Sequence, residues 1–101
     1  MKKPPKVKLE RKVQPMIVAD VKAIGGLACK VLPFNIIGIP DLLIALPGIG
    51  MFLMEVKKDD GELSAIQVAR IEWLRSIGVT VYVINGIPEW ISLRNRLLPG
   101  H

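Results

Sequence analysis

The sequence predicts an α/β fold in which a small mixed sheet is flanked by helices, in the order αβββαβα. Residues 27–33, 41–46 and 51–57 are short, nearly continuous apolar runs separated by turn residues, a pattern typical of strands covered on both faces. Segments with helical spacing of apolar residues lie on either side of these runs. A fourth run, 79–84, is rich in β-branched residues. Together these elements predict a three-layer sandwich.

The first helix is expected between Glu10 and Ile24 and should stop at Gly25-Gly26. Proline is tolerated only in the first turn of a helix, so Pro15 predicts a regular helix beginning near residues 11–14, with a kink as the alternative. The apolar residues of this segment make one face: Val13, Ile17, Val21 and Ile24.

The second helix is expected over residues 63–77, before Gly78, and a short closing helix over 87–98. One face of the second helix should be buried, because apolar residues recur along it: Ile66, Ala69, Trp73 and Ile77. Trp73 is therefore expected in the core. On the closing helix, Trp90 and the Arg94-Asn95-Arg96 cluster could touch DNA or form an exposed polar face.

A chain of 101 residues is long enough for one domain, expected over residues 9–101 behind a basic arm of residues 1–8. Half of the residues are hydrophobic, which excludes a disordered chain. A body this small buries only about 60–65% of the surface of its unfolded chain. The high proportion of apolar residues therefore favours burial of some apolar surface in a contact between subunits.

The net charge of +5 is concentrated at the N-terminus. Against the single acidic residue Glu10, the first twelve residues hold six basic ones: Lys2, Lys3, Lys6, Lys8, Arg11 and Lys12. Such an arm can bind the phosphates of DNA, or it can be a solvated terminus that aids solubility. Both interpretations stay open on charge alone.

Several classes of protein are excluded. Cys29 is the only cysteine, so no internal disulfide or cysteine-built zinc site can form, and a reducing, cytoplasmic compartment fits. His101 is the only histidine and the last residue, which weighs against a histidine triad. The apolar stretch 31–54 is long enough to span a membrane, but its three prolines, its glycines and the central Asp41 favour short strands. No secretory signal is recognisable.

Charges occur where the pattern predicts burial. Strand alternation puts Glu55 and Lys57 on one face of the third strand. If residues 47–49 form a three-residue hairpin loop, Asp41 lies opposite Glu55; the next even register puts Asp41 opposite Lys57. Two carboxylates beside a lysine suit phosphodiester hydrolysis assisted by Mg²⁺ or Mn²⁺. The alternative is a buried ion pair that fixes the strands in register.

The wider motif pattern favours phosphodiester hydrolysis over a buried ion pair. Gly38-Ile39-Pro40-Asp41, followed fourteen residues later by Glu55-Val56-Lys57, has the form of a PD-(D/E)XK nuclease core. In order, the flanking pieces are Gly25-Gly26, Cys29-Lys30-Val31, Phe52-Leu53-Met54, Gly61-Glu62-Leu63-Ser64 with Gln67, and Leu74 with Gly78-Val79. From about Leu9 to Ile84 the chain resembles the VRR-NUC family of nucleases, which includes stand-alone phage and bacterial proteins. The resemblance implies a restriction-endonuclease-like αβββαβ core.

The resemblance also implies roles for the matching residues. Asp41 and Glu55 would be metal-binding carboxylates, with the Val56 carbonyl as a further ligand, and Lys57 would be the catalytic lysine. Glu10 would complete the acidic cluster, although Pro15 departs from the family pattern and Glu10 could instead be a solvated charge. Gln67 would approach the site, or serve only in a capping box with Ser64. Gln14 and Lys30 match positions often occupied by Gln and Lys, and Lys30 could equally be an ordinary strand-edge residue.

The implied activity is that of a Mg²⁺- or Mn²⁺-dependent DNA endonuclease. Stand-alone family members resemble homodimeric enzymes that resolve four-way (Holliday) junctions, so a homodimer acting on branched DNA is expected, in a bacterium or in the host of a phage. The basic arm and Lys30 would contact phosphates, with weak sequence preference. The alternatives are a nuclease that prefers flaps or duplex ends, a non-catalytic nucleic-acid-binding module and, more distantly, a peripheral membrane protein.

Overall fold

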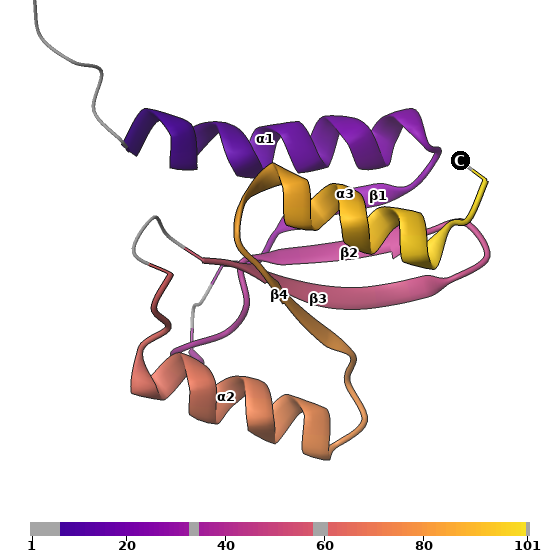
Figure 1. The fold of residues 1–101 in the computed structure, drawn as a ribbon. Helices are drawn as coiled ribbons and strands as arrows, with labels where there is room; N and C mark the ends of the chain where they lie inside the picture. Colours follow the sequence, from indigo (N-terminus) through magenta and orange to yellow (C-terminus); the bar gives the residue numbers. More distant parts are fainter. Residues whose placement is uncertain (1–6, 33–34, 58–60, 101) are drawn as a thin grey trace, which may run out of the picture.

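The computed structural model describes residues 7–32, 35–57 and 61–100, with the side chains from residue 12 onward, and confirms the predicted α/β fold and element order (Figure 1). The helices are α1 (Val7–Ala23), α2 (Ala65–Ser76) and α3 (Gly86–Leu97). The strands are β1 (Leu27–Lys30), β2 (Leu42–Leu46), β3 (Gly50–Val56) and β4 (Val81–Ile84). No helix in these ranges is long and apolar enough to cross a membrane.

The four strands form one mixed sheet in the order β1-β2-β3-β4. The pairs β1–β2 and β2–β3 are antiparallel, and β3–β4 is parallel, because α2 carries the chain across before β4 begins. In the β2–β3 hairpin Leu46 pairs with Gly50 and Leu42 with Met54. The connecting loop is therefore residues 47–49, which corresponds to one of the two even registers that the sequence left open.

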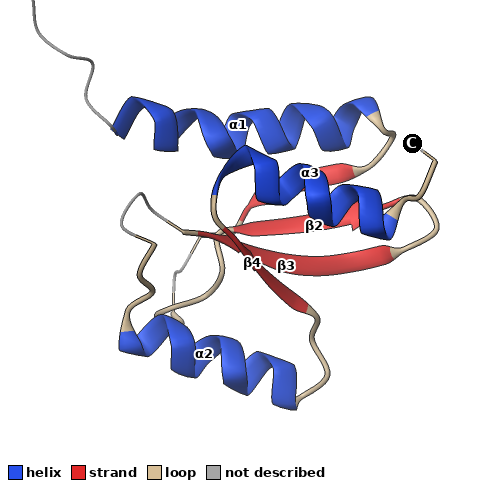
Figure 2. Ribbon diagram, viewed as in Figure 1, coloured by secondary structure: helices blue, strands red, loops and turns tan. Residues whose placement is uncertain are grey.

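Helices lie on both faces of the sheet (Figure 2). We call these the α1/α3 face and the α2 face. The larger core lies on the α1/α3 face, where α1 and α3 pack on the inward side chains of β2 and β3; its most buried members are Ile17, Val21, Ile44, Met54 and Trp90. A smaller core on the α2 face joins Ile71 and Leu74 to Val81.

Helix α1 differs from the prediction, because it begins at Val7 and includes Pro15 in its interior. The expected start near residues 11–14 is therefore wrong. A proline inside a helix removes one hydrogen bond and costs about 3 kcal/mol. Pro15 lies on the exposed side of α1, whereas Ile17 and Val21 are fully buried against the sheet. Burial of such side chains is worth about 1.5–3 kcal/mol each, which offsets the proline.

The buried face of α2 is also different from the one expected. Ile66, Trp73 and Ile77 are 46%, 45% and 59% exposed, so Trp73 is not a core residue. The sheet is instead covered by Ile71 and Leu74. Because α2 carries apolar residues on two adjoining faces, its sequence alone did not decide which face meets the sheet.

Two expectations for the strands and one for α3 need correction. Strand β1 ends at Lys30, short of residue 33, and Met51 is 66% exposed, so the α2 face is only partly covered.

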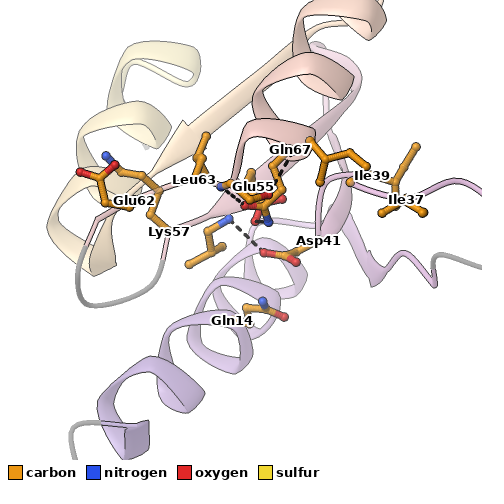
Figure 3. A pocket seen from close by; sticks show the side chains of 13 residues that line it. Gln14, Ile37, Ile39, Asp41, Glu55, Lys57, Glu62, Leu63 and Gln67 are labelled. Atoms are coloured by element: carbon orange, nitrogen blue, oxygen red, sulfur yellow. Dashed lines mark hydrogen bonds between the residues drawn. The ribbon is translucent and has the colours of Figure 1, made fainter.

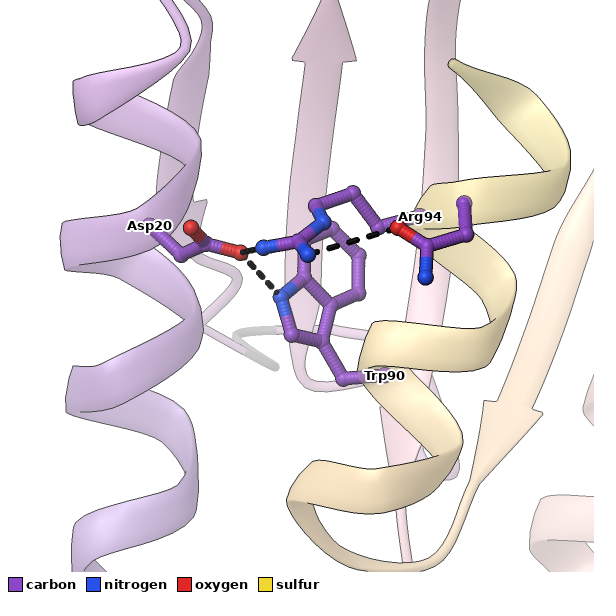
Figure 4. A network of polar contacts seen from close by, with 4 residues as sticks. Asp20, Trp90 and Arg94 are labelled. Carbon is purple, nitrogen blue, oxygen red and sulfur yellow. Dashed lines mark hydrogen bonds and ion pairs between the residues drawn. The ribbon is translucent and has the colours of Figure 1, made fainter. Parts of the chain in front are cut away.

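On α3, Trp90 is 1% exposed. Its Nε1 donates to Asp20 Oδ2 at 2.7 Å, and Arg94 bonds to the same oxygen at 2.9 Å (Figure 4). Trp90 and Arg94 therefore join α3 to α1, whereas Asn95 and Arg96 are exposed, as expected for a polar helix face.

Candidate active site

A cleft of about 640 Å³ opens between α1, the loop before β2, the end of β3 and the start of α2 (Figure 3). Five residues to which the resemblance assigns a catalytic or metal-binding role line it: Asp41, Glu55, Val56, Lys57 and Gln67. Gln14 reaches the cleft from α1, and Ile37, Ile39, Leu63 and Ile66 add apolar wall. The fold thus brings segments from four parts of the chain to one opening.

Asp41 lies directly before β2 and is tied to the neighbouring strands. Its Oδ2 accepts the Val56 N–H at 3.2 Å, and its carbonyl accepts the Val31 N–H at 2.8 Å. Continuing the hairpin register by one pair beyond Leu42 and Met54 puts Asp41 opposite Glu55. Of the two even registers considered from the sequence, the structure has the one that pairs the two carboxylates.

Glu55 is the only buried charged residue in the described part of the chain, at 3% exposed. Burial of a carboxylate is costly unless hydrogen bonds or opposite charges compensate it. Gln67 supplies one such bond, since its Nε2 donates to Glu55 Oε2 at 3.2 Å. Glu55 therefore puts a carboxylate at a buried position of the kind that apolar side chains usually occupy.

Gln67 takes part in a helix capping box and also contacts the buried Glu55. Its Oε1 accepts the Ser64 N–H at 2.8 Å, while the Ser64 hydroxyl accepts the Gln67 N–H at 3.2 Å, which completes a capping box at the start of α2. Because the amide oxygen is held by this cap, the amide nitrogen faces Glu55. One side chain thus links the helix cap to the buried carboxylate.

The loop that carries Asp41 rests on α2 at Gly38. Gly38 has a φ of +80°, and a Cβ atom there would lie 2.8 Å from the Ile66 carbonyl oxygen, so only glycine fits this close approach. Next to it, Arg70 Nε donates to the Ile37 carbonyl at 3.0 Å, and Pro40 is fully buried. These contacts fix the path of the chain into Asp41.

Lys57 follows the last residue of β3, and its N–H donates to the Ile84 carbonyl at 2.8 Å. Its side chain extends toward Glu62, to the side of the cleft away from Asp41 (Figure 3). Glu62 is a cleft residue to which the sequence analysis assigned no role. Glu62 belongs to the Gly61–Ser64 motif, so the sequence marked its position but gave no reason to assign it a role.

Other predicted residues lie outside this cleft or outside the described side chains. Lys12 and Lys30 are exposed, and Lys30 lines a neighbouring cavity of about 540 Å³ that shares Gln14 with the cleft. The side chain of Glu10 is not among those described. The same holds for five basic residues: Lys2, Lys3, Lys6, Lys8 and Arg11.

The oxygen donors of the cleft fit a hard divalent cation. Asp41, Glu55 and the Val56 carbonyl belong to the donor class that Mg²⁺ and Mn²⁺ prefer. Among the described side chains, no group of three or more His, Cys, Asp or Glu residues comes together at one point. A full coordination sphere would therefore need water, substrate or a further ligand.

Comparison with known proteins identifies the fold. No protein-family model and no curated protein matches the sequence. A solved structure described as "VRR_NUC domain" is 29% identical with a TM-score of 0.71, and the match covers 86% of this chain and 94% of that one. Another, "VRR_NUC domain protein", is 21% identical with a TM-score of 0.66 over 97% and 91% of the two chains, a likeness of fold alone. The chain therefore has the VRR-NUC fold over nearly its whole length, which confirms its resemblance to this family of nucleases.

Proposed function

We propose that the protein is a Mg²⁺- or Mn²⁺-dependent DNA endonuclease that hydrolyses phosphodiester bonds in branched DNA, four-way junctions included. The observation that carries this proposal is the meeting of Asp41, Glu55, Lys57 and Gln67 at one cleft in a VRR-NUC fold. The basic arm provides charge for binding DNA, and a cytoplasmic location fits the single cysteine.

In this proposal Asp41, Glu55 and the Val56 carbonyl would hold the metal ion. The resemblance to the family implies Glu10 as a further ligand; in α1 it precedes Gln14, which lines the cleft, by four residues or about one helical turn. When bound, the ion polarises the phosphate and lowers the pKa of water. Gln67 keeps the Glu55 carboxylate oriented through the 3.2 Å hydrogen bond.

Lys57 acts on the substrate in this scheme. A lysine ammonium stabilises the negative charge that develops on the phosphate and can orient the attacking water. Its flexible stem allows the ammonium to turn from Glu62 toward a phosphate in the cleft.

DNA binding is assigned to the basic arm together with Lys12 and Lys30. Lys30 lines the cavity next to the cleft, so it can reach a phosphate of the strand that enters the cleft. These contacts are made to phosphates and not to the edges of the bases, so the protein should show weak preference for DNA sequence. A homodimer suits a branched substrate, because a two-fold axis relates two clefts to two strands.

The test is cleavage of a labelled four-way junction, a flap and a linear duplex, with Mg²⁺, Mn²⁺ or EDTA. Wild type should cut the branched substrates with either metal and none with EDTA. Lys57→Ala should lose roughly 10²–10³-fold in rate, as expected for loss of a transition-state charge partner. Lys22→Ala, an exposed lysine in the last turn of α1, is the matched control and should retain full activity.

Each outcome separates the candidate functions. Equal cutting of duplex and junction would retain the nuclease and overturn the substrate preference. Binding of all three DNAs without cutting in either metal would favour a non-catalytic binding module. In that case the Asp41–Glu55 cluster would be structural.

A further inference from the structure

Helix α2 carries an exposed tryptophan that the proposed cleavage chemistry does not use. Trp73 is 45% exposed. Arg70 precedes it by three residues, and the guanidinium Cζ lies 5.0 Å from the centroid of the indole ring. We call these two residues the Arg70–Trp73 pair. The pair places a planar cation over the indole and leaves nearly half of the tryptophan open to solvent.

The Arg70–Trp73 pair is joined to the cleft by direct contacts. Arg70 Nε donates to the Ile37 carbonyl at 3.0 Å, and Ile37 lines the cleft (Figure 3). Ile66 also lines the cleft, and it shares one side of α2 with the pair because Arg70 and Trp73 follow it by four and seven residues. Seven residues of helix rise about 10 Å, or roughly three steps of a DNA strand at about 3.4 Å each. A strand that leaves the cleft along α2 therefore passes the pair within a few nucleotides.

Arg70 has hydrogen-bonding capacity left for a phosphate. Its Nε is used by Ile37, whereas Nη1 and Nη2 make no hydrogen bond to any residue that the structure describes. A guanidinium binds phosphate well through such a pair of donors. Glu72 is the only acidic residue of α2, and it lies about 100° around the helix from Trp73. The pair thus combines a cation with an aromatic surface, as proteins that bind single-stranded nucleic acid do.

An exposed indole face favours an unpaired base over a duplex. In a continuous duplex each base is stacked between its neighbours, and taking it out of the stack costs free energy. That cost is smaller at a branch point, in a flap or at a strand end, because a base there is already unpaired. Every base has a π face, so stacking on Trp73 does not depend on which base it is. The pair therefore suits DNA structure and not DNA sequence.

We propose that the Arg70–Trp73 pair binds an unpaired nucleotide of the DNA strand that leaves the cleft, with the base stacked on Trp73 and a phosphate on Arg70. The pair then selects DNA with unpaired bases beside the scissile phosphate over a continuous duplex. This inference rests on the proposed function, since it names the form of DNA that the cleft accepts. It is tested by binding, without metal and without cleavage.

The first test is the tryptophan fluorescence of the protein in EDTA, titrated with oligothymidylate or with a long blunt duplex at the same nucleotide concentration. Trp73 and Trp90 are the two tryptophans of the chain, and Trp90 is 1% exposed. Oligothymidylate should quench the emission of wild type, and the duplex should quench it less. Trp73→Phe, which keeps only the buried Trp90, should show no quenching. Absence of quenching in wild type, or equal quenching by the duplex, would overturn the proposal.

The second test is the affinity for labelled oligothymidylate in EDTA, measured by fluorescence anisotropy. Trp73→Ala should weaken binding about 5- to 150-fold, the range expected for loss of one stacked base. Trp73→Phe keeps an aromatic face and should stay within a few-fold of wild type, and circular dichroism checks the fold of both variants. Ile91→Ala, at a 40% exposed position on α3, is the matched control and should bind as wild type does. Equal affinity of wild type and Trp73→Ala would contradict the stacking contact.

The contact of Arg70 with a phosphate has its own readout. Arg70→Gln should reduce the slope of log affinity for oligothymidylate against log salt by about 0.7, the value for one phosphate of a single strand. Lys22→Gln, at an exposed lysine in the last turn of α1, should leave the slope unchanged. A wild-type slope in Arg70→Gln would refute the phosphate contact.

A protein partner is the other class of occupant for an exposed tryptophan. Iodide should quench Trp73 in the protein without DNA, and bound oligothymidylate should protect it. Protection from iodide before DNA is added would mean that protein covers the pair, and it would overturn the nucleotide site.

The two proposals fail separately. Quenching by oligothymidylate in a protein that cuts no DNA would refute the proposed function and leave the nucleotide site intact. Cleavage with Mn²⁺ by a protein whose Trp73 does not respond to DNA would refute the nucleotide site and leave the nuclease intact.

Discussion

The link between Gln67 and Glu55 gives a prediction that separates a functional from a structural role. Gln67→Ala removes the hydrogen bond to Glu55 Oε2 and the bond from the Ser64 N–H. Ser64→Ala removes only the hydroxyl that accepts the Gln67 N–H. The two variants therefore share a damaged helix cap and differ in the support of the buried carboxylate.

The magnitudes follow from the environments of these bonds. Loss of a side-chain cap costs about 1 kcal/mol, and the capping bonds here are exposed. The bond to Glu55 is partly buried and has a charged acceptor, a class worth about 1.5–3 kcal/mol. Ser64→Ala should thus lose about 1 kcal/mol of unfolding free energy, and Gln67→Ala about 2–4 kcal/mol. Only Gln67→Ala should weaken Mn²⁺-dependent cleavage, because Glu55 is left without its amide donor.

The assay combines urea unfolding with cleavage rates over a Mn²⁺ titration. The expected pattern is a raised Mn²⁺ requirement for Gln67→Ala and an unchanged one for Ser64→Ala. If both variants lose equal stability and equal activity, Gln67 acts through the helix cap alone and the reasoning is refuted. Gln67→Asn, which keeps an amide but shortens the reach, should resemble Gln67→Ala in activity.

Three further predictions concern the fold and the arm. Asp20→Ala leaves the buried Trp90 Nε1 without its acceptor and should cost about 2 kcal/mol in urea unfolding, while the cleavage rate of the folded protein stays unchanged; a loss of activity at full stability would contradict this. Gly38→Ala places a Cβ against the Ile66 carbonyl at a φ of +80°, so it should cost about 1–3 kcal/mol and reduce cleavage by displacing Asp41; wild-type rates would show that the loop path does not matter. Deletion of residues 1–8, with four lysines, should reduce the slope of log affinity for DNA against log salt by about 3–4, and an unchanged slope would show that the arm is solvated.

The parts of the fold that depend on local chemistry could be predicted from the sequence. The sequence limited the hairpin to two even registers, and both put the two carboxylates and the lysine on one face. The helix face of Ile17 and Val21 was also predictable, because only one apolar side exists in that segment. Asp41, Glu55 and Lys57 could be expected at one cleft, because motif and register pointed to the same residues.

Other features depend on packing that no single segment encodes. Helix α2 offers two apolar sides, and the choice of Ile71 and Leu74 for the core depends on the position of the sheet beneath it. The interior position of Pro15 could not be foreseen, because burial at the far end of α1 offsets its cost.

The central claim is that the carboxylates of this cleft support metal-dependent DNA cleavage, and Asp41→Asn tests it most directly. Asparagine keeps an oxygen that can accept the Val56 N–H, so the strands stay joined while the negative charge is lost. The measurement is the initial rate of junction cleavage against Mn²⁺ concentration for wild type and Asp41→Asn. The account predicts saturable, Mn²⁺-dependent cutting by wild type and a loss of at least about 10²-fold in the variant. Cutting by Asp41→Asn at the wild-type rate, with the same Mn²⁺ dependence, would contradict it.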